Sequence, residues 1–213
     1  MTNRDERSAS RGPRRADAHW STLRLRDRIA PGLNVLFVGI NPGVQSAITG
    51  HHFAGFSNRF WKLLAESKLV PEPITYREDE RLMEWGFGVT NLVARPSPGI
   101  DDLAPAEYVA GWKILERKIA TFRPRIVAFV GVTAYRAVLP LLADVPVGPP
   151  AGRRPKGDAA APVIGPRPQI VHGARLFVLP NPSGRNANYT YAEMLDAFRA
   201  LRRYSRSSRS SNA

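Results

Sequence analysis

Four short runs that are apolar at nearly every position most constrain how this chain can fold. They cover residues 34–39, 87–93, 125–131 and 175–180, and helical patterns separate them. Strands that are apolar throughout, rather than at alternate positions, are typical of parallel sheets covered by helices on both faces. The sequence therefore predicts an α/β fold, a three-layer α/β/α sandwich around a short, mainly parallel four-stranded sheet.

Helical periodicity occupies residues 58–68, 104–122 and 191–204, and a short helix is expected from Thr133. In the longest of these segments apolar residues recur at the three- and four-residue spacing of one helix face. Asp101 or Asp102 lies just before it and is the expected N-cap, because an Asp carboxylate can accept from the unpaired N–H groups of a first helical turn.

The ends of the chain and one internal stretch depart from this pattern. Residues 1–18 and 205–213 are polar and rich in Arg or Ser, so we expect a disordered basic arm and a disordered Ser/Arg tail. Residues 145–168 are rich in Pro and Gly and are expected to form an irregular insertion. The predicted organisation is one domain over residues 19–204, in a protein that we expect to be a monomer.

Composition limits the chemistry that is available. The chain has no Cys, which excludes disulfides, a thiolate nucleophile and Cys-bound metal, and its four His are too few for an easily closed metal site. We therefore expect no metal and no cofactor. No apolar run approaches the ~18 residues of a membrane span, and the charged N-terminus lacks the apolar segment of a secretory signal. A cytoplasmic, nucleoid-associated protein with no membrane partner is the expectation.

The formal net charge is +13, from 31 Lys and Arg against 18 Asp and Glu. A surplus of this size favours a polyanionic partner, because each phosphate that the protein neutralises releases condensed counterions. Solubility, or a genome that encodes Arg often, is the alternative explanation. Charge therefore indicates nucleic acid as the candidate partner without naming a reaction.

Three loops that follow strands carry unusual polar residues: Gly39-Ile-Asn-Pro-Gly43, Asn91 to Pro96 and Pro180 to Arg185. Ligands of open α/β sheets bind beyond the carboxyl ends of the strands, so these loops would share one rim. The first loop has neither the GxGxxG of dinucleotide folds nor the GK[ST] of a P-loop. A plain turn remains its other interpretation, because Asn-Pro favours turns.

Four motifs occur in order along the domain. They are Gly39-Ile-Asn-Pro-Gly43 continuing to Gly50-His-His-Phe53, then Asn58-Arg-Phe-Trp61, Gly88 to Pro96, and Asn181-Pro-Ser-Gly184. Together they closely resemble the mismatch-specific uracil-DNA glycosylase and thymine-DNA glycosylase family of the uracil-DNA glycosylase superfamily, over roughly residues 31–204. The resemblance implies an enzyme that everts a uracil-type base from double-stranded DNA, hydrolyses its N-glycosidic bond and leaves an abasic site for base-excision repair.

The resemblance also implies residue roles. Asn41 would orient the attacking water, which an amide can position but not deprotonate. Phe53 would stack under the everted base, because an aromatic face recognises any base plane; a core aromatic is the alternative for this residue. Asn58 and the Ile40 backbone would read the base edge. Ser46 is a weaker pocket candidate.

Four further residues lie near this rim in the sequence: Asn91, Asp102, His51 and His52. Asn91 ends the second strand at the place where an amine would be needed for Schiff-base chemistry. The three loops contain no Lys, so we expect a monofunctional enzyme, with Asn91 as part of the base pocket. Asp102 is the candidate auxiliary base, although a helix N-cap is the commoner use of such an Asp. His51 and His52 are expected to be solvated loop residues.

The last loop would face the duplex, through Asn181, Ser183, Gly184, Arg185 and Asn186. Arg185 occupies the position of the family's apolar wedge, which leaves the opposite-base preference open. Asn181 stands where single-strand-selective relatives carry His, although the adjoining residues resemble theirs, so a broader specificity of that type remains an alternative. A DNA-binding module without catalysis and a hydrolase of free nucleosides are the other classes that we considered.

Overall fold

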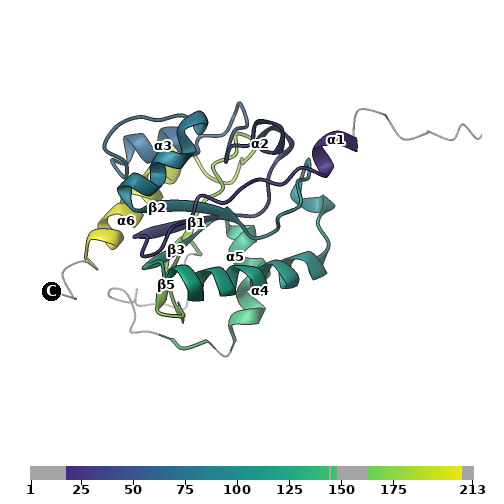
Figure 1. Cartoon of the computed structure of the whole chain (residues 1–213). Helices are drawn as coiled ribbons and strands as arrows, with labels where there is room; N and C mark the ends of the chain where they lie inside the picture. The colour runs from purple at the N-terminus through teal and green to yellow at the C-terminus, as the bar shows by residue number, and fades with distance from the viewer. Residues whose placement is uncertain (1–17, 144, 148–162, 208–213) are drawn as a thin grey trace, which may run out of the picture.

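A computed structural model describes residues 18–143, 145–147 and 163–207 and has a five-stranded sheet at its centre. The strand order is β2-β1-β3-β5-β4. The strands are β1 (Val35–Gly39), β2 (Phe87–Asn91), β3 (Ile126–Val130), β4 (Gly165–Val171) and β5 (Ala174–Leu179). Helices cover both faces of the sheet (Figure 1), so the predicted three-layer α/β/α architecture is confirmed.

Four strands are parallel and end at one edge of the sheet. β1 pairs with β2 and β3, and β3 pairs with β5, all in the same direction. The register sets Gly39 beside Asn91 and Val130 beside Leu179. The loops that follow β1, β2 and β5 therefore leave the sheet at the same rim, as the sequence predicted.

The fifth strand is a correction to the predicted four-stranded sheet. β4 pairs antiparallel with β5 at the edge of the sheet, and its first four residues belong to the stretch predicted as an irregular insertion over 145–168. Pro166 and Pro168 hide the strand in the sequence. Proline is tolerated there because an edge strand has one side on which no ladder partner needs its N–H. Residues 148–162 of the predicted insertion lie outside the described residues.

The helices are short except for two. They are α1 (Ala18–Ser21), α2 (Val44–Thr49), α3 (Phe60–Glu66), α4 (Pro105–Phe122), α5 (Val132–Val138) and α6 (Tyr191–Ser207), with 3-10 segments η1 (Tyr76–Trp85), η2 (Ile100–Asp102) and η3 (Leu139–Leu142). α6 continues through Ser207, so the start of the predicted disordered tail at 205 is wrong. Residues 1–17 of the predicted arm and 208–213 of the tail lie outside the described residues. No helix in the described ranges is long and apolar enough to cross a membrane.

The predicted N-cap of the longest helix is also wrong. α4 begins after Ala104, whose N–H donates to the Glu107 carboxylate at 2.9 Å. Asp102 instead accepts from the N–H of Gly99 at 3.0 Å and closes the η2 turn. Glu107 is available for the cap because its place three residues into the helix lets its carboxylate reach back to the free N–H group.

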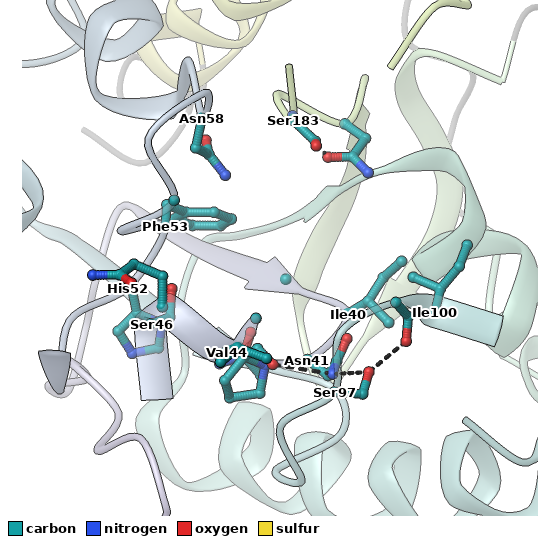
Figure 2. Close-up of a pocket in the computed structure, with 18 of the residues that line it drawn as sticks. Ile40, Asn41, Val44, Ser46, His52, Phe53, Asn58, Ser97, Ile100 and Ser183 are labelled. Carbon is teal, nitrogen blue, oxygen red and sulfur yellow. Dashed lines mark hydrogen bonds between the residues drawn. The ribbon is translucent and has the colours of Figure 1, made fainter. Parts of the chain in front are cut away.

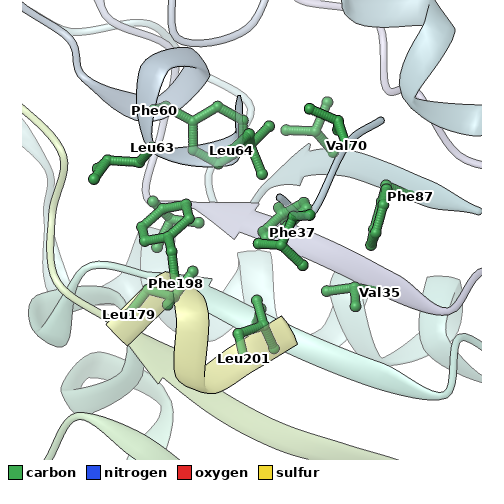
Figure 3. Packing of buried hydrophobic residues seen from close by; sticks show 14 of the residues in the cluster. Val35, Phe37, Phe60, Leu63, Leu64, Val70, Phe87, Leu179, Phe198 and Leu201 are labelled. Atoms are coloured by element: carbon green, nitrogen blue, oxygen red, sulfur yellow. The ribbon is translucent and has the colours of Figure 1, made fainter. Parts of the chain in front are cut away.

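Both faces of the sheet are buried, which explains why its strands are uniformly apolar. Val35 and Phe37 of β1 pack under α3 and α6, together with Phe60 and Phe198 (Figure 3). The alternate residues of the same strand pack toward α4 and α5 on the opposite face. Because successive side chains of a strand point to opposite faces, the residues at positions 35–38 of β1 alternate between two cores.

α4 approaches the backbone after β2 at a glycine. A Cβ at Gly111 would lie 2.2 Å from the main-chain oxygen of Leu92, an atom that cannot move without shifting the sheet edge. Because Gly111 has no side chain, α4 can pack close to the loop that follows Asn91 and carries residues of the rim.

We predict that Gly111→Ala lowers the melting temperature by several degrees. Alanine favours a helix interior by about 1 kcal/mol over glycine, but overpacking against a fixed backbone costs about 1–3 kcal/mol, and a 2.2 Å approach makes the clash prevail. Thermal unfolding measures the change. Gly43→Ala is the control, since an added Cβ there meets no atom within 4 Å; equal melting temperatures for both variants would contradict the prediction.

Candidate active site

A cavity of about 660 Å³ opens at the carboxyl edge of the sheet, between the loops that follow β1, β2 and β5. Most of the residues predicted for the site line it: Ile40, Asn41, Ser46, Phe53, Asn58, Asn91, Asn181, Ser183 and Arg185. Three others, Asp102, Gly184 and Asn186, do not. Figure 2 shows Ile40, Asn41, Ser46, Phe53, Asn58 and Ser183. The structure thus brings side chains that are far apart in the sequence, from position 40 to position 185, to one rim of the sheet, as the sequence predicted.

Asn41 presents a hydrogen-bond acceptor to the cavity. Its Nδ2 lies 2.8 Å from Ser97 Oγ (Figure 2). The same nitrogen lies 3.2 Å from the main-chain oxygen of Arg95. A carbonyl oxygen can only accept, so the NH₂ half of the amide must face Arg95. Oδ1 then has no hydrogen-bond partner among the described residues, and it is free to accept a hydrogen from a water molecule.

Ser97 fixes that orientation and was missed from the sequence. Its side chain is almost fully buried, and its hydroxyl donates to the main-chain oxygen of Gly99 while it accepts from Asn41. Its own N–H donates to Pro42 at 3.1 Å, which joins the loop after β2 to the loop after β1. The motif considered in the sequence ended at Pro96, one residue too early.

The Phe53 ring forms one wall of the cavity. Phe60 stacks on it with ring centroids 4.0 Å apart and an interplanar angle of 25°, and Phe53 itself is partly exposed to the cavity. Its backbone has φ 53°, a left-handed conformation that costs a non-glycine residue roughly 1–2 kcal/mol. The surrounding contacts must therefore hold this residue in place.

Ser46 is one of these contacts. It lines the cavity, as predicted for a pocket residue, but its hydroxyl accepts from the N–H of Ala54 at 3.1 Å and is buried. Trp61 adds a second contact, because its indole N–H donates to the main-chain oxygen of His52 at 3.2 Å. Ser46 therefore positions the residue after Phe53.

Asn58 presents a donor to the same cavity. Its Oδ1 accepts from the N–H of Phe60 at 3.0 Å, at the start of α3. The NH₂ half of the amide is left to face the space beside the Phe53 ring, where Figure 2 shows the nitrogen. Asn41 and Asn58 thus offer opposite hydrogen-bonding groups, an acceptor and a donor, in one hollow.

Asn91 and Gly39 meet at the floor. A Cβ at position 39 would lie 2.7 Å from Asn91 Oδ1 and 3.6 Å from the Phe53 ring. Only glycine leaves room there for both side chains. Ile40 follows as a buried apolar part of the wall.

The cavity contains no strong base and no amine. Among the described residues, no Asp, Glu or Lys lines it, and no group of three or more His, Asp and Glu that could hold a metal ion occurs in the described part of the chain. The polar side chains of the site are amides, hydroxyls, one His and one Arg. Such a set can position water and stabilise developing charge, but it offers neither a carboxylate base nor a Schiff-base nucleophile.

Comparison with known proteins agrees with this geometry. The model of the family described as "Uracil DNA glycosylase superfamily" matches residues 27–202. The chain belongs to the uracil DNA glycosylase superfamily. A solution NMR structure of a Methanosarcina acetivorans protein, provisionally assigned as a uracil DNA glycosylase, shares the fold with a TM-score of 0.51 at 18% identity, over 84% of this chain and 98% of that one. The predicted membership at superfamily level is confirmed, and the protein is a DNA glycosylase.

A buried carboxylate outside the cavity holds the segment that leads to Phe53 of this glycosylase. Asp79, in η1, is fully buried, and its Oδ2 accepts from the N–H of His52 at 2.9 Å. Its Oδ1 lies 3.0 Å from Arg28 Nε and 3.1 Å from His51 Nδ1. Arg28 also donates to the main-chain oxygen of Gly50 at 3.3 Å. The sequence analysis found neither Asp79 nor Arg28.

His52 is buried rather than solvated, which corrects the expectation for this residue. Only 1% of it is exposed, and its Nε2 donates to the main-chain oxygen of Arg26 at 3.1 Å. Burial lowers the pKa of His52 to about 4, because the charged imidazolium loses its hydration. The ring is therefore neutral at physiological pH and serves the packing of the loop.

The loop after β5 is braced internally and docked on the loop before α3. Asn181 Oδ1 accepts from the N–H of Ser183 at 3.0 Å, and Asn186 Nδ2 donates to the Asn181 main-chain oxygen at 2.8 Å. A Cβ at Gly184 would lie 2.4 Å from Ser57 Cβ, so the two loops touch there. Of the predicted DNA-binding residues, Gly184 contacts Ser57, Asn186 braces the loop through Asn181, and Arg185 is exposed at the mouth.

Asp102 lies beside the cavity, next to the lining residues Gly99 and Ile100, rather than in its wall. Its carboxylate is exposed and accepts from Gly99, and the residue does not line the cavity. Its main-chain oxygen accepts from Arg95 at 2.7 Å. Asp102 is not an N-cap either: Gly99 holds that position in η2, and the Asp102 carboxylate reaches back to its N–H from three residues further on.

We predict that stability falls as the pH falls from about 6.5 to about 4, in part because of His52. Its pKa is 6.5 when exposed and about 4 when folded, so the unfolded chain binds the proton first in this window. The stabilisation is present above pH 6.5, is lost progressively as the pH falls to about 4, and amounts to on the order of 3 kcal/mol.

Denaturant unfolding of the wild type and of His52→Gln between pH 4 and 7 measures this contribution. The Gln amide can still donate to Arg26 but does not titrate, so its stability should depend less steeply on pH. Parallel curves for the two proteins would show that His52 does not carry the effect.

Proposed function

We propose that this DNA glycosylase is monofunctional and excises uracil, including uracil in G·U mismatches, from double-stranded DNA as the first step of base-excision repair. It would evert the nucleotide, hydrolyse the N-glycosidic bond and leave an abasic site. One observation supports this most: the free acceptor of Asn41 and the Phe53 ring face one cavity that also receives the Asn58 amide.

The reaction breaks the bond between C1′ of deoxyribose and N1 of uracil. The bonding electrons leave with the base as a uracil anion, and the sugar becomes oxocarbenium-like. A water molecule that Asn41 Oδ1 holds through one hydrogen adds to C1′ and loses its proton to solvent. Asn58 Nδ2 would donate to a uracil carbonyl oxygen, on which negative charge grows as the bond lengthens.

The absence of a base from the cavity lining suits this mechanism. A leaving group that departs as an anion needs little nucleophilic assistance, so orienting water is sufficient, although the chemistry will be slow. Mispaired uracil opens more easily than paired uracil, and part of the eversion cost is then removed by the mismatch itself. No Lys lines the cavity among the described residues, which favours hydrolysis over strand cleavage through a Schiff base.

Directed at O4 of the base, the Asn58 NH₂ group also favours uracil over cytosine. Uracil presents carbonyl oxygens on both sides of N3, whereas cytosine replaces one with an amino group that must donate. A fixed NH₂ group beside an amino group would leave two donors facing each other without an acceptor. The Phe60 N–H, at the start of α3, donates to Asn58 Oδ1. This hydrogen bond prevents the amide from rotating so that its oxygen and its NH₂ group exchange places.

Asn41→Ala should reduce single-turnover uracil release by at least about 100-fold, because the attacking water loses its orientation. Binding to a duplex that contains an abasic-site analogue should stay near the wild-type value. Release of free uracil from a labelled G·U duplex and fluorescence anisotropy measure the two quantities. A parallel loss of binding and of thermal stability would show that Asn41 is structural instead.

Asn58→Asp tests which half of the amide contacts the base. A carboxylate can still accept from the N–H of Phe60, so α3 should start normally. The donor to the base is lost, and excision of uracil should fall roughly 10- to 1000-fold, as when one transition-state donor is removed. Melting temperature controls for folding; unchanged uracil release would exclude Asn58 as the group that contacts the base carbonyl.

A further inference from the structure

Phe56 is the most exposed large hydrophobic side chain of the described residues, with a relative exposure of 101%. Isolated exposed apolar residues are common on protein surfaces and need no explanation by themselves. Phe56, however, lines the candidate active site, as do Arg185 and Ile100. Its position, rather than its exposure alone, indicates a function.

Phe56 stands at the tip of a rigid turn. The N–H of Asn58 donates to the main-chain oxygen of Gly55 at 2.9 Å, which closes a β-turn with Phe56 at its first central position. Contacts described above hold the turn at both ends: Ala54 donates to Ser46, and Arg59 donates to Pro182 at 2.9 Å. The ring is therefore displayed on a fixed support.

The turn and the loop after β5 form one surface. Ser57 touches Gly184 so closely that no Cβ would fit between them, which places the residues next to each of them, Phe56 and Arg185, on adjoining turns. Both line the cavity mouth, and both are exposed. The mouth thus carries one apolar aromatic ring and one guanidinium, in a chain of net charge +13.

We propose that Phe56 is the aromatic wedge of this glycosylase, which stacks on a duplex base left exposed when the damaged nucleotide is everted. The inference rests on the proposed function. Eversion leaves a hole and an unstacked base face in the duplex, and a flat apolar ring can cover that face whatever the base. Arg185 is charged and is not an apolar plug; its guanidinium is suited to a guanine edge or a phosphate beside the ring.

Binding to a duplex that contains a tetrahydrofuran abasic analogue opposite guanine tests this, since no chemistry is needed. Phe56→Ala should weaken binding roughly tenfold, while binding to the undamaged duplex should change by less than about twofold. Phe56→Trp keeps an aromatic face and should remain close to the wild type. Ile114→Ala is the matched control, because Ile114 is 45% exposed on α4 and does not line the cavity.

A second readout locates the contact. With 2-aminopurine beside or opposite the abasic analogue, the wild type should change the fluorescence of the probe on binding, and Phe56→Ala, at saturating protein, should change it less. Equal affinity and equal fluorescence for Phe56→Ala and the wild type would overturn the proposal, as would an equal loss of affinity on abasic and undamaged duplexes. A binding site for a protein partner at Phe56 would give the first of these results.

Uracil release by the wild type separates the two levels of inference. If the wild type excises uracil and Phe56→Ala binds the abasic duplex normally, the wedge is wrong and the proposed function stands. If the wild type releases no uracil from any duplex, the proposed function itself fails. Unaltered melting temperatures of the variants exclude unfolding as the cause of any loss.

Discussion

The candidate site depends on the buried carboxylate of Asp79. It anchors the N–H of His52 and the side chains of Arg28 and His51, and so holds the segment that ends in the left-handed backbone of Phe53. A buried charge is tolerated when it is fully paired. The paired charges of Asp79 and Arg28 thus lie behind the cavity, where they fix the backbone, and the polar side chains around the Phe53 ring include amides and hydroxyls.

Within the cavity, two amides are oriented by the same principle. The NH₂ group of Asn41 donates to the main-chain oxygen of Arg95 and to Ser97 Oγ, which leaves its oxygen to accept from solvent. Asn58 uses its oxygen on the start of α3, and its NH₂ group remains for a ligand. An amide has a donor and an acceptor on one planar group, so a protein contact to one half determines what the other half can offer. Preorganised polar groups of this kind suit a reaction in which charge separates.

The sequence predicted what depends on local pattern. Uniformly apolar strands gave the layers, and the residues that follow them gave Asn41, Asn91 and the loop after β5. It failed where the determining contact is distant in the chain: Asp79 meets His52 from 27 residues away, with no periodicity to reveal it. The prolines of β4 hid this strand in the sequence. The cap of α4 was assigned to the wrong carboxylate, because a cap depends on where the helix begins, and Glu107 accepts from the first free N–H.

The contact between Gly184 and Ser57 has a mechanical consequence. Two loops that would grip the duplex from different parts of the chain are locked together, with a main-chain hydrogen bond from Arg59 to Pro182 beside them. Under the proposed function, the two loops would meet a duplex as one unit, and the bending that eversion requires would fall on the DNA. Flexible pyrimidine–purine steps around a lesion would then ease eversion, and stiff A-tracts would resist it.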